Sequence, residues 1–518
     1  MIHSVNNLSQ YGLMPDIPFT ELPLSAWTRA QNVRFRDGSV EKITGEAEVY
    51  ATPVVAPYWL LHCPSNQWLY AGLAGVGATD ETSHADITRA AGAYTGTDQD
   101  AWTGTVIEGI PVLSNNVDAP QMWSPPTLAT PLVALTGFPA ATLCKALRSY
   151  KRYLVALNVT KTGVSYPYLV KWSDQAPSNG VPVSWDYTDQ TIDAGEYSLP
   201  AEGGIIHDMI LLRDSGIIYK EQQTWKMDYV GGAEIFRFNK IFDSIGAVNS
   251  RCAREYFSGK HIVFSGDDLI LHDGVQAESL LTGKAQTLLT SKVNPDRFDQ
   301  AYVAANYYSK EVWCCFCESG ESLPSRALVW NWVKNTITER ELPGAAFIAD
   351  GAITPSTDLW SSSATDWSSD TGVWLDGQPN RNERRLLIAA PAATKLYIAD
   401  STNQFAGVSM TAFVERSSIG FPLKKEAPPD FTTEKLVKGI WPRITGTAGG
   451  IVNVYIGSQD VIDGAVTWEA AMPYTIGTST FLDPLVAGRL HALRFESTGN
   501  LAWKLNGYDV DVVAIGSR

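Results

Sequence analysis

Short runs of alternating apolar and polar residues recur along most of this chain. Alternation with a period of two is typical of strands that bury one face. Three segments contain two such runs joined by turn residues: "MILLRDSGIIYKE" (209–221), "HIVFSGDDLILHDG" (261–274) and "RRLLIAAPAATKLYIAD" (384–400). The segment 311–335 is a longer-looped version, and further strands are expected at 67–75, 152–159, 167–174 and 183–187. The pattern predicts a series of antiparallel hairpins.

Helical periodicity is scarce. The best candidate is "PAATLCKALRSYKRYL" (139–154), whose spacing predicts a short helix that runs directly into a strand. Gly (42) and Pro (28) are plentiful, and so are Trp (17), Tyr (21) and Phe (17). Aromatic residues suit half-buried pleated surfaces, and Gly and Pro suit turns. The expected fold class is therefore all-β.

The predicted hairpins are evenly spaced. Those near residues 209, 261 and 311 start about fifty residues apart, and a fixed spacing of one β unit is typical of propellers and solenoids. Propeller blades are four-stranded sheets of about this size. Counting the runs between Tyr58 and Asp400 predicts a β-propeller of about six or seven blades. The alternative is a row of β-sandwich domains, although no Pro/Ser-rich linker divides the run.

Three regions are expected along the chain. Residues 1–57 form an N-terminal arm and hairpin, and residues 58–430 form the propeller-like region. Within it, residues 356–378 are rich in Ser, Thr, Asp and Trp and are interpreted as an exposed loop inserted in a blade. Residues 431–518 contain five strand-like runs and are expected to form a C-terminal β-sandwich or ring-closing sheet.

The early stretch "NVRFRDGSV" (32–40) predicts a tight hairpin. Val33 and Phe35 alternate with Arg34 and Arg36, and an Asp-Gly pair precedes the next alternating run. Asp-Gly between two such runs is the strongest short-range hairpin signal. Two strands alone bury too little apolar surface to be stable in water. This hairpin therefore needs a further surface to pack against.

Composition restricts the classes of function. With 45% hydrophobic and 18% charged residues the chain is globular, and 518 residues exceed one ordinary compact core. The formal net charge of −15 argues against a sequence-reading nucleic-acid binder, which carries a basic stripe. A surface that DNA slides past without adhering remains compatible with this charge.

The cysteines and the apolar segments give expectations about compartment and membrane. Six cysteines are sparse for this length, no secretory signal is visible at the start, and no apolar run reaches membrane-spanning length. Synthesis in a reducing cytoplasm with free thiols is expected. "CCFC" (314–317) lacks the second thiol pair of a metal site. In a strand, Cys315 and Cys317 would share one face and Cys314 the other, as small buried hydrophobes.

Motifs that carry chemistry are not found. "GLAGVGATD" (72–80) lacks the spacing of a dinucleotide loop, there is no HExxH, and the seven histidines are scattered. His261 and His272 flank one predicted hairpin and are interpreted as satisfied or exposed side chains rather than a metal pair. No residue is assigned a catalytic, cofactor-binding or metal-ligating role, and no cofactor is expected.

A sialidase-like glycosidase is the catalytic alternative, because those enzymes are also propellers. "SSDTGVW" (368–374) approaches their Asp-box turn, but its Trp comes one residue early and it occurs once. Glycoside hydrolysis needs a positioned pair of carboxyl groups, and the adjacent Asp267 and Asp268 suit a turn. Exposed tryptophans at 360, 367 and 374 could stack on sugar rings, or pack on their own blade or on a neighbouring subunit. A carbohydrate-binding or depolymerising propeller therefore stays open as the second hypothesis.

Several stretches together resemble one family. "GLMPDIPFTELPLSAWTRAQNVRFRDGSVEKITG" (12–45), "GIPVLSNNVDAPQMWSP" (109–125), the strands "YLVKWSD" and "VSWDYTD", and the closing "GSQDVIDGAVTW" and "AGRLHALRFESTGNLAWKLNGYDVDVVAIGSR" resemble the landmarks of tail nozzle (tail hub) proteins of short-tailed bacteriophages. Each motif is made of strand and turn residues, and their order along the chain carries the resemblance. Residues 356–378 have no counterpart in the family pattern.

The resemblance implies a structural virion protein and not an enzyme. Six copies would form a ring below the portal and adaptor, extend the DNA ejection channel, and offer the outside to tail fibres, spikes or a needle. It also implies localisation in the virion tail, after assembly in the host cytoplasm. We expect residues 1–45 to pack across a neighbour or the adaptor, and acidic or small polar residues to face the channel so that DNA does not adhere. Another phage baseplate or tail propeller, or a host-side enzyme of another kind, are the remaining alternatives.

Overall fold

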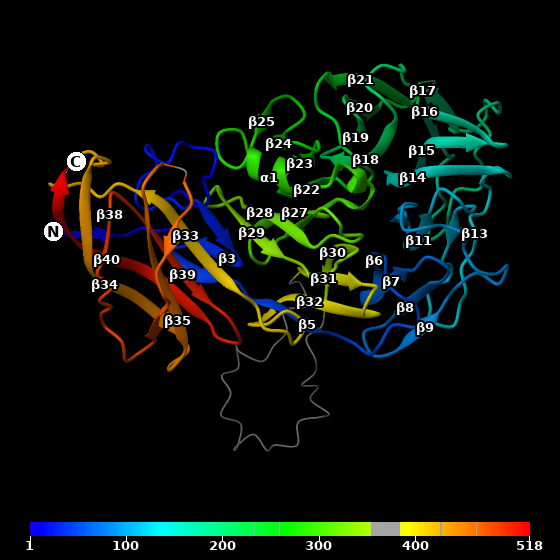
Figure 1. The fold of residues 1–518 in the computed structure, drawn as a ribbon. Helices are drawn as coiled ribbons and strands as arrows, with labels where there is room; N and C mark the ends of the chain where they lie inside the picture. Colours follow the sequence, from blue (N-terminus) through cyan, green and yellow to red (C-terminus); the bar gives the residue numbers. More distant parts are fainter. Residues whose placement is uncertain (233, 258, 354–383, 425–426, 463, 518) are drawn as a thin grey trace, which may run out of the picture.

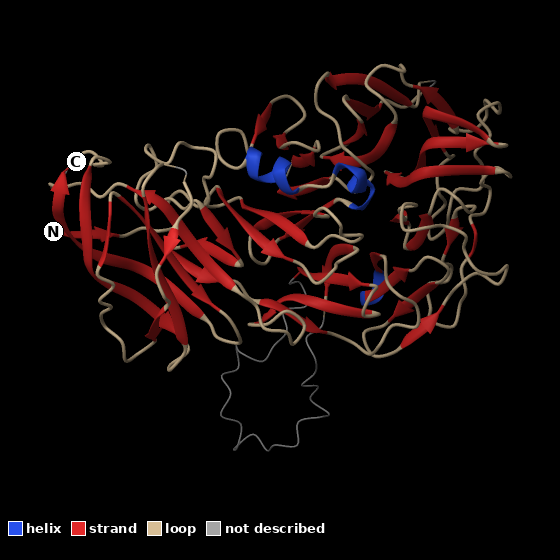
Figure 2. Cartoon of the chain, viewed as in Figure 1, coloured by secondary structure: helices blue, strands red, loops and turns tan. Residues whose placement is uncertain are grey.

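The computed structural model describes residues 1–232, 234–257, 259–353, 384–424, 427–462 and 464–517. Almost all regular structure in these residues is β (Figure 2). The helical elements are α1 (Gln286–Lys292) and the 3₁₀ turns η1 (Pro64–Asn66) and η2 (Pro295–Gln300). The predicted all-β class is confirmed. The predicted loop at 356–378 lies outside the described residues.

Seven sets of four antiparallel strands make up the larger part of the molecule, six of them separate sheets and the sixth set part of a ten-stranded sheet. The first three are β6 (Trp59–Cys63), β7 (Gln67–Ala71), β8 (Val76–Thr79), β9 (His84–Asp86); β10 (Thr103–Ile107), β11 (Ile110–Ser114), β12 (Gln121–Met122), β13 (Val133–Ala134); and β14 (Thr142–Tyr150), β15 (Tyr153–Lys161), β16 (Val164–Trp172), β17 (Gly195–Ser198). The fourth and fifth are β18 (Ile206–Leu212), β19 (Ser215–Lys220), β20 (Thr224–Tyr229), β21 (Phe236–Phe242); and β22 (Ala253–Phe257), β23 (Lys260–Phe264), β24 (Leu269–His272), β25 (Ala277–Ser279). The sixth and seventh are β26 (Tyr302–Asn306), β27 (Glu311–Phe316), β28 (Arg326–Asn331), β29 (Thr336–Glu341); and β30 (Phe347–Ala352), β31 (Arg384–Ala390), β32 (Lys395–Thr402), β5 (Gly45–Glu48).

The seven sheets contact one another in a cyclic order. The first strand of each sheet contacts the first strand of the next, from β6 through β10, β14, β18, β22 and β26 to β30, and β30 in turn contacts β6. Apolar clusters lie between successive sheets, including one between the seventh and the first that contains Trp68, Leu387 and Leu396. No single sheet of the described residues closes on itself, so the cycle is made by packing between sheets (Figure 1).

The seventh sheet takes its last strand from the N-terminal end of the chain. β5 pairs antiparallel with β32, placing Glu48 opposite Tyr397 and Ala47 opposite Ile398. About 350 residues separate the two partners, so this strand ties the start of the chain to the sheet that completes the cycle.

Two further sheets pack together beside the cycle and hold both chain ends (Figure 1). One contains β1 (Ile2–Val5), β3 (Val33–Arg36), β4 (Ser39–Lys42), β34 (Thr433–Gly446), β38 (Val486–Gly488) and β40 (Trp503–Ser517). The other contains β2 (Arg29–Gln31), β33 (Ala412–Ile419), β35 (Ile451–Gln459), β36 (Thr467–Trp468), β37 (Met472–Thr475) and β39 (Leu490–Ser497). β2 also pairs with β29, which makes the second sheet continuous with the sixth sheet of the cycle.

The hairpin predicted at 32–40 is present and pairs with the C-terminal strand. Asp37 and Gly38 both have positive φ, 51° and 78°, as the tight hairpin turn requires. Val40 pairs with Leu505 of β40, and Val33, Phe35 and Val40 are buried in the core of the two C-terminal sheets. The surface that this hairpin needs is supplied by its own chain.

Strand pairing crosses both predicted domain boundaries. Strands from residues 1–57 join the seventh sheet and both C-terminal sheets, and β33, which precedes residue 431, pairs with β39. The hydrophobic pattern locates strands but does not indicate with which distant strand each one pairs.

Two local predictions are wrong. The helix predicted at 139–154 is a strand, β14, followed by a tight turn into β15, with Leu147 and Leu154 buried against the second sheet. Packing against two neighbouring sheets overrides the helical spacing of a short segment. The strand predicted at 183–187 is a loop, although Trp185 is buried as a core residue.

We predict that Gly45→Ala loosens the seventh sheet. A Cβ at this position would clash with the backbone oxygen of Gln404, so the chain must shift where β5 enters the sheet. Overpacking of this kind costs about 2 kcal/mol, measured as a lower urea midpoint. Gly516→Ala is the control, because its Cβ would meet only the Glu434 carboxylate at 3.9 Å. Equal stability of the two variants would contradict the account of β5.

Candidate functional site

Five ionisable side chains meet in the interior where the N-terminal strands, the sixth sheet and the seventh sheet come together. They are Arg34 on β3, Glu46 on β5, Glu311 on β27, Arg340 on β29 and Asp400 on β32. None of these side chains is more than 9% exposed. We call this group the ionic junction.

Asp400 is the centre of the ionic junction. Its two oxygens lie 3.3 Å from Arg34 Nη2, and Oδ1 lies 3.2 Å from Arg340 Nη1. Asn306 donates to Oδ2 at 2.8 Å, and the Ser309 hydroxyl donates to the same oxygen. The carboxylate is thus surrounded by donors, as a buried charge requires.

The two arginines have further partners. Arg34 forms a two-point pair with Glu311, whose Oε2 lies 3.0 Å from Arg34 Nη2. Arg340 donates to Glu46 Oε1 at 2.5 Å, and its guanidinium lies 4.1 Å from the centre of the Trp313 ring. Planar guanidinium groups suit such combined pairing and stacking.

The electrostatics favour a charged Asp400. Burial alone would raise its pKa, but Arg34 and Arg340 hold the pKa of this carboxyl well below its usual range. Burial would lower the pKa of Arg34, but Glu311 and Asp400 raise it. Burial raises the pKa of Glu46 to about 7 in spite of Arg340. Burial therefore makes Glu46 a weaker acid than an ordinary glutamate.

Asn32 fixes the approach of β3 to the sixth sheet. It has a φ of 55°, which asparagine tolerates better than most residues. Its Nδ2 donates to Glu341 Oε2 at 2.7 Å and to the Thr411 oxygen at 2.8 Å, and its Oδ1 accepts from the Glu341 backbone at 2.9 Å. All four residues of "NVRF" (32–35) are therefore buried and have a structural role.

Arg34 departs from the sequence expectation. Arg34 alternates with the apolar residues in the same way as Arg36, and Arg36 is exposed, but Arg34 is buried. The face of β3 that carries Arg34 is covered by strands more than 270 residues away. Because the buried partner is so distant in sequence, the residues around Arg34 do not indicate that it will be buried.

The inner strands of the cycle carry a second set of ion pairs. Arg148 on β14 donates two hydrogen bonds of 2.7 Å to the carboxylate of Asp208 on β18. It also donates to the Gly104 backbone oxygen on β10. Arg254 on β22 pairs with Asp350 on β30, two sheets further along the cycle. This pair joins two sheets that are not neighbours in the cyclic order.

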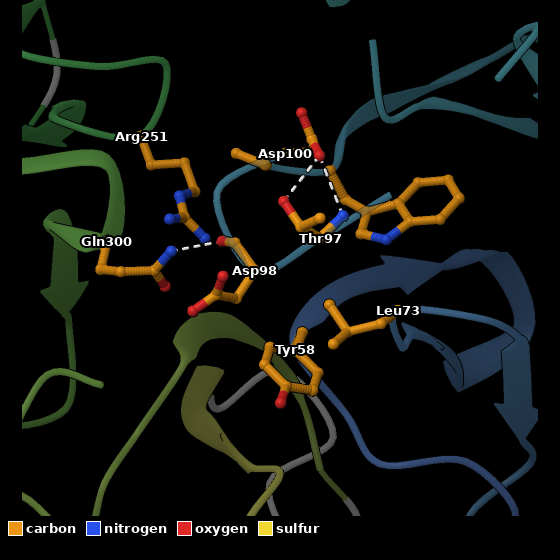
Figure 3. Close-up of a pocket in the computed structure, with 9 residues that line it drawn as sticks. Tyr58, Leu73, Thr97, Asp98, Asp100, Arg251 and Gln300 are labelled. Carbon is orange, nitrogen blue, oxygen red and sulfur yellow. Dashed lines mark hydrogen bonds between the residues drawn. The ribbon is translucent and has the colours of Figure 1, made fainter. Parts of the chain in front are cut away.

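A small pocket lies beside these inner strands (Figure 3). Arg251 and Gln300 point toward the 97–100 loop, and the Gln300 amide donates to the Asp98 backbone oxygen. The free volume is about 10 Å³, which is room for a single water. The pocket is too small for an organic substrate.

His261 and His272 are buried partners of one tyrosine. The Tyr219 hydroxyl lies 2.7 Å from His261 Nδ1 and 2.7 Å from His272 Nε2. His261 Nε2 donates to the Leu211 oxygen, and His272 Nδ1 accepts from the Gly274 backbone. These contacts assign one proton to each ring and link the fourth and fifth sheets, so the interpretation as satisfied histidines is confirmed.

All three "CCFC" cysteines are buried, and Cys314 and Cys315 lie in apolar cores, whereas Cys317 follows the end of β27 and is near Arg297 and Asp299. Cys314 belongs to the core toward the fifth sheet, and Cys315 to the core toward the seventh. Burial raises the pKa of Cys315 to about 12, which disfavours the reactive thiolate form. Within the described residues, no three His, Cys, Asp or Glu side chains gather in a way that could hold a metal ion.

The remaining candidate carboxylates do not converge. Asp267 is exposed in the β23–β24 turn, where it accepts from Ser265, while Asp268 is buried and accepts from the Leu269 backbone. The Asp-box-like segment and the tryptophans at 360, 367 and 374 lie outside the described residues. No helix in the described part of the chain is long and apolar enough to span a membrane.

Comparisons with known proteins give distant structural likenesses. No family model and no curated protein matches this chain. PorZ, a surface component of the type-IX secretion system of Porphyromonas gingivalis, is 9% identical over 73% of this chain and 43% of its own, with a TM-score of 0.35. An ancestral GH74 enzyme is 9% identical over 73% of this chain and 51% of its own, with a TM-score of 0.36. This chain thus matches about half, or less, of the length of these two proteins, and the likeness carries no argument about function.

We predict that Asp400→Asn strongly destabilises the protein. The amide would turn a donor toward Arg34 or Arg340 and leave buried guanidinium charge uncompensated, at a cost of about 3–5 kcal/mol in the free energy of unfolding. Lys395→Gln breaks an exposed pair with Glu48 on the same two strands, β32 and β5, and is expected to cost less than about 1 kcal/mol. Urea titrations measure both. Similar midpoints for the two variants would rule out the ionic junction as a major source of stability.

We also predict a loss of stability in acid caused by the buried histidines. Burial lowers the pKa of His261 to about 4 and that of His272 to about 3, whereas histidine in an unfolded chain titrates near pH 6.5. The unfolded chain therefore takes up protons that the folded chain cannot hold, and stability falls as the pH drops from about 6.5 toward 3. Histidine-selective NMR should find both rings neutral at pH 5. Titration of either ring near pH 6.5 in the folded protein would contradict the assignment.

Proposed function

We propose that the seven sheets form a seven-bladed β-propeller. The cyclic order of the inner strands, the apolar cluster between the seventh and first sheets, and the ion pair between Arg254 and Asp350 support this arrangement. The last blade would be completed by β5, so that strands from distant parts of the chain lock the ring. Radial repetition of this kind leaves only short, protected sheet edges.

We further propose that the protein is a tail nozzle subunit of a short-tailed bacteriophage, with a structural role. The observation that carries this proposal is that residues of the "NVRFRDG" stretch, which is central to the family resemblance, have structural roles. Asn32 and Arg34 are engaged in buried contacts, Val33 and Phe35 are core residues, and Asp37 and Gly38 form the turn. These residues connect the N-terminal arm, the cycle of sheets and the C-terminal sheets. Such a role suits a rigid subunit of a channel wall rather than a reactive site.

In this proposal six copies form a ring below the portal and adaptor. Six chains of net charge −15 carry −90, and negative charge on the channel wall would keep DNA from adhering during ejection. The outside of the ring would serve as the platform for fibres, spikes or a needle. The arm is anchored within its own chain through β1 to β5, so the ring contacts would come from other surfaces.

We predict that the purified protein joins portal–adaptor complexes of the same virion as a six-fold ring. Electron microscopy of the mixture is the measurement, with the complexes alone as the control. Antibody labelling of intact virions should mark the tip of the tail. Labelling elsewhere on the particle, or a ring that is not six-fold, would contradict the proposal.

A further inference from the structure

We propose that a groove between the third and fourth sheets binds an uncharged glycan. The groove lies between the outermost strands β17 and β21 and has a volume of about 770 Å³. Ligand pockets for small molecules measure about 300–1,000 Å³, so the size suits a short stretch of sugar chain. This inference goes beyond the structural role proposed above and does not depend on it.

Aromatic rings line both sides of the groove. Tyr197 on β17 and Phe238 on β21 stack face to face, with ring centres 4.6 Å apart and planes within 4°. Trp172 and Phe236 form the deeper part of the lining in an edge-to-face pair. These rings hold one another in place, so the aromatic surface exists before a ligand arrives.

Two tyrosine rings are open to solvent at the groove. Tyr187 is 53% exposed and Tyr197 is 44% exposed. The ammonium groups of Lys171 and Lys161 lie 4.9 Å and 5.4 Å from the centre of the Tyr187 ring and hold it in position. Flat, exposed and immobilised rings suit stacking against the C–H faces of sugar rings.

Three carboxylates of the groove each use one oxygen within the fold. Asp189 Oδ1 accepts hydrogen bonds from the backbone and the hydroxyl of Thr191. Asp193 Oδ2 accepts from the Tyr153 hydroxyl and the Gln175 amide. Glu196 Oε2 accepts from the ammonium groups of Lys161 and Lys171. In the described contacts the second oxygen of each carboxylate accepts no hydrogen bond. Oriented acceptors beside aromatic faces suit the hydroxyl groups of a sugar.

The charges select the class of glycan. Asp189, Asp193 and Glu196 would repel carboxylated or sulfated sugars. The cations at the groove are already paired, Lys161 and Lys171 with Glu196 and Arg237 with Glu234. The groove therefore favours neutral sugars and disfavours the sialic acid that a sialidase recognises. A peptide strand or a polyamine could also meet open strand edges and carboxylates, and the test separates them.

The test is to titrate the intact protein with neutral hexasaccharides built from glucose, mannose, galactose or N-acetylglucosamine. Binding is measured by ligand-observed NMR and by calorimetry. At least one should bind with a Kd on the order of 1 mM or below, and an anionic uronate hexasaccharide should bind at least about tenfold more weakly. Tyr187→Ala and Tyr197→Ala should each weaken binding about tenfold. Tyr308→Ala, which removes another half-exposed tyrosine outside the groove, is the matched control and should leave binding unchanged.

Three results would overturn the inference. One is the absence of saturable binding of every neutral hexasaccharide up to about 10 mM. Another is binding that neither tyrosine substitution weakens, in variants whose circular dichroism and urea midpoint match those of the parent. The third is binding of spermine or of the anionic hexasaccharide alone. Each would leave the ring-forming role untouched, because that role is tested by assembly on the adaptor.

Discussion

A carboxylate enclosed by two guanidiniums is the constraint on which the rest of the structure depends. Asp400 is fully enclosed, and its charge is tolerable only while Arg34 and Arg340 stay in place. Arg34 comes from the hairpin at the start of the chain, Arg340 from the sixth sheet and Asp400 from the seventh. Displacing any one of these parts leaves a buried charge without a partner, so they are expected to form or separate together.

The parts that the junction joins also connect the two ends of the chain. The hairpin that carries Arg34 is also a member of the sheet that contains β40, and the chain continues from it into β5 of the seventh sheet. The C-terminal sheets are therefore connected to the cyclic set of sheets through paired strands and through the ionic junction. The side chains of the junction are buried, so they join the parts of the chain and are not open to a substrate.

Sequence reasoning succeeds where the signal is local. The hairpins near 209, 261 and 384 and the Asp37-Gly38 turn follow from alternation and turn chemistry, which act over a few residues. It fails where a distant partner decides the outcome. Leu147 lies in a strand because neighbouring sheets cover it, and Arg34 is buried because its partners arrive from more than 270 residues away. The Tyr219 hydroxyl likewise gains its role from two histidines on the next sheet.

Hydrogen–deuterium exchange across the intact protein tests the central claim most directly. If the ionic junction makes the parts one cooperative unit, amides of β3, β5 and β32 should open with the same free energy as those of the inner strand β26, under conditions where exchange reports opening equilibria. Exchange of β3 and β5 orders of magnitude faster than that of β26 would mean that the arm detaches alone, and the account would be wrong.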